Sequence, residues 1–198
     1  MPSERFYKLK QVKKRTFLRM AYKEFALHSF EGASITRLVS DLKMAKGSVY
    51  QYFNDKEDLY NYLVEHAYSQ LYSLLTKTSP ISSSTNGFDA WYKNYLLVYL
   101  KFFCAIPAYA LLIKRNKTDF IESENESEKL ISEMVISASN KSLNNETIYA
   151  LNTLPITIFN YIIISNQIDI KELIESDGTL DISSNKLLYL CEAFLNKN

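Results

Sequence analysis

The segment over residues 34–59, SITRLVSDLKMAKGSVYQYFNDKEDL, constrains the fold more strongly than any other part of this chain. Between residues 35 and 42, apolar side chains recur at helical spacing and line one face of a short helix. A second short segment begins at Lys46, where Val49 and Phe53 supply an apolar edge. Two short helices around a sharp turn, the second with hydrogen-bonding side chains at its start, are the pattern of a helix-turn-helix.

The order KGSVYQYFNDKEDL is more specific than a general helix-turn-helix pattern. It closely resembles the signature of the tetracycline-repressor (TetR) family of bacterial transcription regulators. In that family, a recognition helix that ends in an aromatic pair is followed by an acidic-capped helix that begins with Lys. The resemblance runs from about Lys8 to Leu63, roughly a third of the chain. Beyond Leu63, members of the family share architecture more than sequence.

The composition favours helices over strands. The chain has 198 residues, of which 47% are apolar and only four are Gly and four Pro. This is ample for a hydrophobic core and too few turn residues for a β-rich fold. Together with the resemblance, it predicts an all-α protein with a three-helix helix-turn-helix head over residues 1–55. Residues 56–198 would then form a helical ligand-binding and dimerisation bundle.

Positive charge gathers in the N-terminal part of the chain. Residues 1–58 carry twelve Lys/Arg against seven Asp/Glu, whereas residues 59–198 carry eleven against fifteen. Chance clustering on a solvated surface is one explanation of this asymmetry. A basic head on an acidic body is also typical of a module that binds nucleic-acid phosphates. The early turns of the first predicted helix add to that cluster with Lys8, Lys10, Lys13, Lys14 and Arg15.

Hydrophobic periodicity and capping signals place the remaining elements. A loop is expected at residues 79–87 and a turn-rich break at residues 176–184. Thr118 is the expected cap of one helix, and Pro155 is expected to kink another. Residues 156–164 are so rich in β-branched side chains that propensity alone favours a strand, but their surroundings favour a helix. The predicted helices cover residues 8–29, 35–42, 46–53, 56–77, 88–105, 107–116, 118–141, 145–166 and 185–195.

The second helix of the motif carries side chains that suit DNA. Gly47 projects nothing from its Cα, so the helix can come close to a DNA backbone. Lys46 in the first turn can reach a base edge or a phosphate, and Gln51 can pair with adenine in the major groove. Each of these residues taken alone is equally compatible with an ordinary surface role, and it is their order that points to DNA.

The resemblance assigns contacts residue by residue. It implies that the positions of Ser34, Lys46, Ser48, Tyr50 and Lys56 contact phosphates or bases, with Lys56 serving a phosphate at the start of its helix. The complete set of predicted DNA-binding residues is Ser34, Thr36, Lys43, Lys46, Gly47, Ser48, Tyr50, Gln51, Tyr52 and Lys56.

Two positions depart from the family pattern. Lys43 occupies the turn where the family usually has Gly, so a non-Gly residue is expected to adopt a left-handed geometry there or to add a phosphate contact. Ala45 replaces the usual Ser or Thr cap of the recognition helix, which forfeits about 1 kcal/mol of capping free energy. Both departures affect the detailed contacts more than the class of protein.

The body contains a stripe of aromatic residues between Tyr68 and Tyr109. Such a stripe at helical spacing is often plain core, but tyrosine hydroxyls need partners, which is awkward in a dry interior. In the resembled family, this region encloses a ligand pocket, and an apolar cavity with hydroxyls suits a small hydrophobic or aromatic molecule. The predicted ligand-binding residues are Tyr68, Tyr72, Trp91, Tyr95, Tyr99, Phe102 and Tyr109.

Catalytic and metal chemistry find little support in the sequence. The only histidines are His28 and His66, and no zinc spacing, Gly-rich phosphate loop or nucleophile elbow occurs. Cys104 and Cys191 lie in apolar surroundings, where they behave as small buried residues of a reducing compartment. We therefore expect no enzyme activity, no cofactor and no metal. No signal peptide is evident, and residues 94–113 suit a buried helix better than a membrane span, so a cytoplasmic location is expected.

The leading hypothesis is a homodimeric repressor that a small hydrophobic effector releases from a pseudo-palindromic double-stranded DNA operator. Residues 156–164 and 187–195 are too apolar for a lone chain to cover, so they are expected to pack against a second copy. The resemblance implies that this contact is a four-helix interface. One alternative is a small-molecule sensor whose head does not bind DNA, and a more distant one is an interaction adaptor. Retention of Lys46, Gly47, Tyr50 and Lys56 favours the repressor over the sensor.

Overall fold

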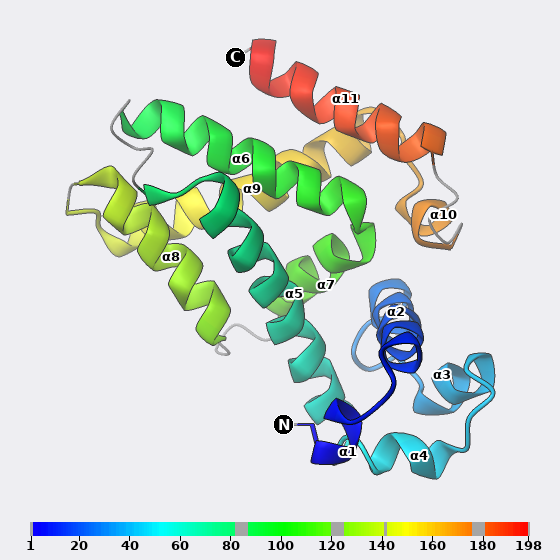
Figure 1. The fold of residues 1–198 in the computed structure, drawn as a ribbon. Helices are drawn as coiled ribbons and strands as arrows, with labels where there is room; N and C mark the ends of the chain where they lie inside the picture. Colours follow the sequence, from blue (N-terminus) through cyan, green and yellow to red (C-terminus); the bar gives the residue numbers. More distant parts are fainter. Residues whose placement is uncertain (1, 82–86, 120–124, 141, 176–180, 198) are drawn as a thin grey trace.

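The computed structural model describes residues 2–81, 87–119, 125–140, 142–175 and 181–197. Every regular element in these ranges is a helix, which confirms the predicted all-α class. The helices arrange as a small head joined to a larger bundle (Figure 1). Their bounds are α1 Glu4–Tyr7, α2 Gln11–Leu27, α3 Ile35–Asp41, α4 Lys46–Tyr50, α5 Lys56–Thr78, α6 Phe88–Ala105, α7 Pro107–Asp119, α8 Glu126–Ser139, α9 Asn145–Ser165, α10 Ile170–Glu175 and α11 Asp181–Lys197.

An aromatic cluster holds the head together. Phe6 from α1 is fully buried, with its ring 5.7 Å from Phe17 of α2 and 4.9 Å from Phe53. The ring of Tyr62, on α5, lies 5.3 Å from Phe6 and 5.5 Å from Phe53. Aromatic pairs in edge or stacked geometry add to the stabilisation that their buried area provides. The first turns of α5 therefore belong to the core of the head.

The same helix carries the chain into the body. α5 runs out of the head and between the helices of the bundle, where it packs on α6, α7 and α8 (Figure 1). On the far side of the body, α6 packs against α9 and α11. One continuous hydrophobic cluster of buried residues extends from Phe6 in the head to Cys191 in α11. The division at residue 55 stays a prediction, because α5 contributes to both modules.

Several helix predictions agree closely with the structure. α6 occupies the predicted range of residues 88–105, preceded by Gly87 with a φ of 98° that suits glycine. α9 continues as a helix through residues 156–164, so helical context overrides β-propensity there. Pro155 lies inside α9, and the expected kink stays a prediction. At Ile106 the chain bends by 109° between α6 and α7, as expected for a break at Pro107.

Other helix predictions were wrong in their bounds or missed an element. The first predicted helix, residues 8–29, is the shorter α2 at Gln11–Leu27, and the short helix α1 before it was not predicted. α8 begins only at Glu126 with Asn125 as its cap, whereas Thr118 belongs to α7. The predicted break at residues 176–184 is helical from Asp181, and its residues 176–180 lie outside the described part of the chain, as do 82–86 of the predicted loop. The short helix α10 was not predicted.

The two cysteines are buried, as predicted, and the structure adds that they touch. Cys104 on α6 and Cys191 on α11 place their Sγ atoms 3.6 Å apart as free thiols. Contact with the Cys191 thiol, together with burial, raises the pKa of the Cys104 thiol. Neutral thiols in this setting pack as small apolar groups and tie α11 to α6.

By length and composition, α9 is the one described helix that alone could cross a membrane, and the bent pair α6 and α7 passes the same test jointly. Core helices of soluble proteins also pass this test. Here a third of the tested window of α9 is buried inside the fold.

Candidate nucleic-acid interface

The first helix of the motif begins at a side-chain cap. Ser34 precedes α3, and its hydroxyl accepts a hydrogen bond from the backbone N–H of Arg37 at 3.3 Å. This cap satisfies one of the free N–H groups at the helix start. The cap holds α3 in register for the turn that leads to α4.

A buried carboxylate fixes α3 against α2. Glu24 on α2 is 6% exposed, and it accepts two hydrogen bonds from Nε of Arg37 at 2.9 and 3.0 Å, together with one from the backbone N–H of Ser34 at 2.7 Å. The same guanidinium donates to the carbonyl of Gly32 at 2.9 Å. Burial alone would raise the pKa of Glu24, but the bonds from Arg37 and Ser34 outweigh burial and lower that pKa.

We expect Glu24→Gln to destabilise the protein by about 1–3 kcal/mol, because it leaves the Arg37 guanidinium without its charged partner. For a chain of this size, each kcal/mol lowers Tm by about 2–4 °C. The folded-state pKa of Glu24 is depressed, so its contribution is present above the ordinary pKa and is lost as the pH falls through the folded-state value. Thermal melts from neutral to acidic pH should therefore show the difference in Tm between wild type and variant shrinking on acidification. A difference that stays constant with pH would contradict this account.

The turn between α3 and α4 has the geometry that its sequence predicts. Lys43 adopts a φ of 51°, so it takes the left-handed conformation that a Gly would take without cost. The backbone N–H of Met44 donates to the carbonyl of Val39 at 2.9 Å and closes the turn. Ala45 precedes α4 and makes no side-chain cap, as expected from its methyl group. Both departures from the family pattern are thus visible in the backbone.

The recognition helix is shorter than predicted. α4 covers Lys46–Tyr50, and Gln51 ends it, so the predicted extension to Phe53 is wrong. Val49 is buried and anchors the helix on the head, while Tyr50 is 47% exposed. This arrangement turns the N-terminal half of α4 outward at the end of the molecule farthest from the body (Figure 1).

Neither packing within the chain nor the backbone conformation requires a glycine at Gly47. A Cβ placed on it would meet no atom within 4 Å, and its φ lies in the ordinary helical range. Glycine inside a helix costs about 1 kcal/mol relative to alanine. The fold would therefore tolerate a larger residue, and the missing side chain benefits only something that approaches α4 from outside.

Lys56 is engaged inside the head. Its ammonium donates to the carbonyl of Phe30 at 2.7 Å and lies 3.3 and 3.4 Å from the carbonyls of Glu31 and Ala33. The ammonium also lies 4.5 Å from the centroid of the Phe30 ring. These contacts join the start of α5 to the turn between α2 and α3. A phosphate contact by Lys56 stays a prediction, and the structure gives this residue an internal role as well.

The remaining members of the predicted DNA-binding set differ in exposure. Tyr52 is half-buried, with its ring 5.9 Å from Phe6 and 6.2 Å from Phe17, so it helps to support the head. Ser34, Ser48 and Lys56 are half-buried as well. The exposed members of the set are Thr36, Lys43, Lys46, Gly47, Tyr50 and Gln51.

One support of this surface was not predicted from the sequence. The Ser3 hydroxyl donates to the carbonyl of Gln51 at 2.6 Å, and the Ser3 backbone N–H donates to the carbonyl of Tyr52 at 2.8 Å. These bonds satisfy carbonyls at the C-terminal end of α4, where a helix leaves them free. The only sequence signal for this attachment is the apolar Phe6 a few residues later.

The aromatic stripe of the body packs as a continuous stack. The ring of Tyr95 lies 5.4 Å from both Trp91 and Tyr92, and 5.6 Å from Tyr99. Tyr68 is buried on α5, Phe102 packs 5.5 Å from Tyr109, and Tyr72 is half-buried. The structure thus brings most of the predicted ligand-binding residues into one cluster. Of that set, only Tyr109 lines the cleft between head and body described below.

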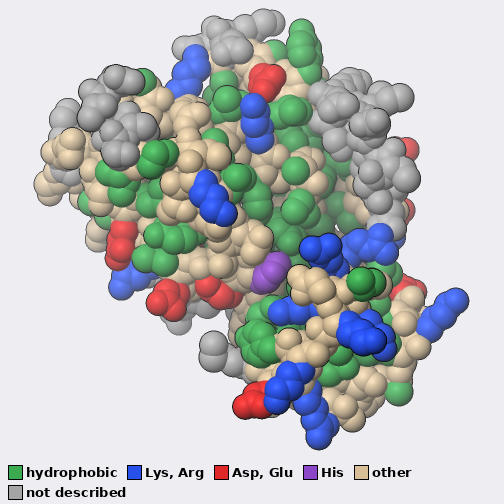
Figure 2. All heavy atoms as spheres, viewed as in Figure 1, with side chains coloured by type: hydrophobic (Ala, Val, Ile, Leu, Met, Phe, Trp, Pro, Cys, Tyr) green, Lys and Arg blue, Asp and Glu red, His purple; other side chains and the backbone are tan. Residues whose placement is uncertain are grey.

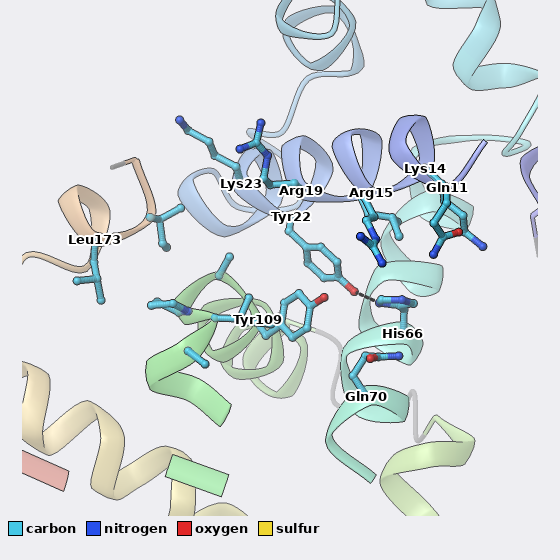
Figure 3. Close-up of a pocket in the computed structure, with 16 residues that line it drawn as sticks. Gln11, Lys14, Arg15, Arg19, Tyr22, Lys23, His66, Gln70, Tyr109 and Leu173 are labelled. Atoms are coloured by element: carbon cyan, nitrogen blue, oxygen red, sulfur yellow. Dashed lines mark hydrogen bonds between the residues drawn. The ribbon is translucent and has the colours of Figure 1, made fainter. Parts of the chain in front are cut away.

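That cleft lies between the head and the body. It has a volume of about 620 Å³ and is bounded by α2, α5, the bend between α6 and α7, and α10. In its wall the Tyr22 hydroxyl lies 2.8 Å from the carbonyl of Leu63 and 2.8 Å from Nδ1 of His66 (Figure 3). Burial, and to a lesser extent the charge of Lys14, lower the pKa of His66, which keeps its imidazole neutral at neutral pH.

Basic side chains gather over the head and along its boundary with the body (Figure 2). Four of them lie on α2 and line the cleft: Lys14, Arg15, Arg19 and Lys23. Lys14 and Arg15 were grouped with the phosphate-approaching cluster of the first helix. The structure instead directs both toward the space between α2 and α5 (Figure 3).

A helix-turn-helix motif in a small helical head, joined by a long helix to an α-helical bundle, is the architecture of helix-turn-helix transcriptional regulators. Comparison with known proteins relates the head to one family. Residues 17–63 match the profile described as "Bacterial regulatory proteins, tetR family". This match runs from α2 to the start of α5 and agrees with the resemblance that the recognition-helix sequence indicated.

Solved structures share this fold over nearly the whole chain. A TetR family transcriptional regulator from Chloroflexus aurantiacus J-10-fl is 26% identical, with a TM-score of 0.70, and the match covers 100% of this chain and 96% of that one. A putative transcriptional regulator from Streptomyces coelicolor has the same fold at 19% identity and a TM-score of 0.59, over 93% and 97% of the two chains. So does a TetR-like regulator from Rhodococcus sp. RHA1, at 13% identity and a TM-score of 0.52, over 96% and 99%. No curated protein matches the chain.

Proposed function

We propose that the protein is a cytoplasmic, homodimeric repressor that binds a pseudo-palindromic DNA operator and leaves it when a small apolar or aromatic molecule binds the body. The observation that carries the DNA-binding part is Gly47, which lacks a side chain on an exposed helix where the fold would accept one. Exposed Lys46, Tyr50 and Gln51 around it supply a cation and hydrogen-bonding groups for phosphates and base edges.

A gel-shift assay tests this function directly. The DNA to use is the region upstream of the protein's own gene and of its neighbours, titrated with the purified full-length chain. We expect a discrete complex whose affinity falls steeply with added salt, because Lys and Arg release counterions from phosphates. A protein that binds neither these fragments nor unrelated duplex DNA at low salt would fit the alternative function, a small-molecule sensor without DNA-binding activity.

Exposed apolar residues on α9 and α11 support the proposed dimer. Ile164 is 74% exposed, Tyr161 59% and Tyr189 69%, although the bulk of the apolar residues in the chain are buried. The Tyr161 ring packs 5.9 Å from Phe194, so the two helices present one surface. An apolar patch of this kind on a small protein marks an interaction site. A second copy of the same surface satisfies it by two-fold symmetry.

A buried hydroxyl supports the proposed effector site in the aromatic stack. The Tyr95 side chain is fully buried, and its hydroxyl makes no hydrogen bond with any residue that the structure describes. Burial raises the pKa of Tyr95 well above its ordinary value, so this hydroxyl stays protonated and able to donate. An unmet donor in an apolar, aromatic setting would be satisfied by a ligand that carries one acceptor group.

Tyr95→Phe separates the effector site from plain core. We expect this variant to be at least as stable as wild type, because it removes a buried hydroxyl that lacks a partner. The free energy of unfolding should rise by up to about 1–3 kcal/mol. Chemical denaturation with the linear extrapolation measures this change. If the hydroxyl serves the effector, an effector that releases wild-type protein from DNA will release Tyr95→Phe less well. A marked loss of stability would instead mean that the hydroxyl is already satisfied in the free protein.

A further inference from the structure

The cleft between head and body differs chemically from the aromatic stack. Its rim carries four of the five cations of α2, and its other polar groups include Gln11, Gln70 and His66. Among the residues that the structure describes, no Asp or Glu lines it. Its floor is apolar, formed by Leu18 and by residues of the α6–α7 bend and of α10 such as Ile106 and Leu173. A cationic rim above an apolar floor favours a ligand that carries both a negative charge and an apolar part.

Arg15 is the residue best placed to meet the charged end. Figure 3 shows its guanidinium pointing from α2 into the space in front of His66. The side chain is exposed, and it makes no hydrogen bond or ion pair with the described part of the chain. Planar guanidinium groups bind carboxylate or phosphate oxygens through paired hydrogen bonds. Lys14 adds a second cation nearby, held 5.0 Å from the rings of Phe6 and Tyr7.

The size and position of the cleft indicate that its ligand is a small molecule and not DNA. A volume of about 620 Å³ lies in the range of small-molecule pockets and is far too small for a DNA duplex. The cleft also faces the body, whereas α4 lies on the opposite side of α2 (Figure 1). These cations therefore cannot all serve the operator that α4 reads.

We propose that this cleft binds a small amphipathic anion, with its carboxylate or phosphate at Arg15 and its apolar part on the floor beside Ile106. The ligand would touch α2 of the head and α7 and α10 of the body at once. A ligand in this position contacts both modules. It can therefore affect how the head is oriented relative to the body. This site is separate from the effector site proposed in the aromatic stack, and it takes a ligand of different chemistry.

Calorimetric titration of the full-length chain, without DNA, tests the proposal with four probes. Decanoate supplies both anion and apolar chain, decanol only the chain, decyltrimethylammonium the chain with the opposite charge, and inorganic phosphate only an anion. We expect decanoate to bind at one site per chain and at least about tenfold more tightly than any of the other three, since one good charge-assisted contact is worth about that factor. Equal binding of decanol and decanoate, or no binding of decanoate, would overturn the proposal.

Variants place the probe in this cleft. Arg15→Gln should weaken decanoate binding about tenfold, while Arg5→Gln, the same change at an exposed residue of α1 outside the cleft, should leave it within about twofold. Ile106 is 38% exposed at the bend and lies outside both helices, so Ile106→Ser should weaken decanoate binding without unfolding the chain. Tyr95→Phe should leave decanoate binding unchanged. Unaltered affinity in both Arg15→Gln and Ile106→Ser would show that decanoate binds elsewhere and would refute the assignment.

The titration is independent of the proposed function. Decanoate binding that depends on Arg15 upholds the cleft site even if the chain binds no operator. A confirmed operator with no Arg15-dependent decanoate binding upholds the repressor and removes the cleft site.

Discussion

We expect Gly47→Ala to bind a confirmed operator about tenfold or more weakly than the unsubstituted protein, although its head should be at least as stable. Within the chain, the new methyl group meets no atom within 4 Å, and alanine is a better helix former by about 1 kcal/mol. Against DNA, the same methyl group projects from the exposed face of α4, where the backbone must approach the groove closely. Unchanged or higher stability together with lower DNA affinity distinguishes a glycine that contacts DNA from one that the fold requires.

The measurement combines a thermal melt with a fluorescence-anisotropy titration at fixed salt, because affinities for DNA have meaning only at a stated salt concentration. Gly32→Ala is the matched control. A Cβ at Gly32 would also fit, 3.4 Å from the Ser29 hydroxyl oxygen, but Gly32 lies in the turn before α3 and not on α4. We expect this control to change DNA affinity by less than about twofold. Equal affinity of Gly47→Ala and wild type would mean that α4 does not approach DNA at this position.

The elements that could be predicted from the sequence are those whose signals are local. α6 begins after Gly87 and ends before Pro107, and these two residues mark its boundaries in the sequence. The recognition segment is likewise defined by a short run of residues, and the left-handed Lys43 follows from where the turn must fall. Residues 156–164 show the limit of local propensity, because their β-branched side chains are helical within a longer apolar helix.

The parts that could not be predicted depend on contacts between distant segments. Lys56 meets three backbone carbonyls more than twenty positions earlier, and a carbonyl leaves no signal in the identity of its residue. Glu24 and Arg37 pair across two helices, although many other pairings of charge were open to them. The cleft at the boundary is assembled from four separate segments. No single stretch of sequence contains it, so Lys14 and Arg15 were interpreted as phosphate contacts.

The second large expected effect concerns the dimer. Ile164→Asp should convert a dimer at micromolar concentration into a monomer, with a loss of at least about a hundredfold in association. Ile164 is 74% exposed in the single chain, so the substitution removes little from the chain's own core. In a symmetric interface, each substitution acts twice, and burying an Ile side chain is worth about 1.5–3 kcal/mol, so two lost contacts account for this factor.

Ile136→Asp is the matched control for this effect. Ile136 is an exposed isoleucine of α8, away from the surface that α9 and α11 share, and its substitution should leave the mass in solution unchanged. Light scattering after size-exclusion chromatography measures the mass over a range of concentrations. A wild-type chain that stays monomeric as its concentration rises, or an Ile164→Asp chain that stays dimeric, would contradict the proposed interface.

Loss of the dimer should also abolish binding to a palindromic operator, even though α4 is untouched. Two recognition helices read successive major grooves roughly 34–36 Å apart only when a dimer holds them at that spacing. A monomer binds each half-site independently and loses the high effective concentration of the second head, which is worth orders of magnitude in affinity. Ile164→Asp should therefore bind a single half-site as well as wild type does, but the full operator far more weakly. Equal loss on the half-site and on the full operator would point to a damaged head, and undiminished affinity for the full operator would mean that DNA binding does not depend on this interface.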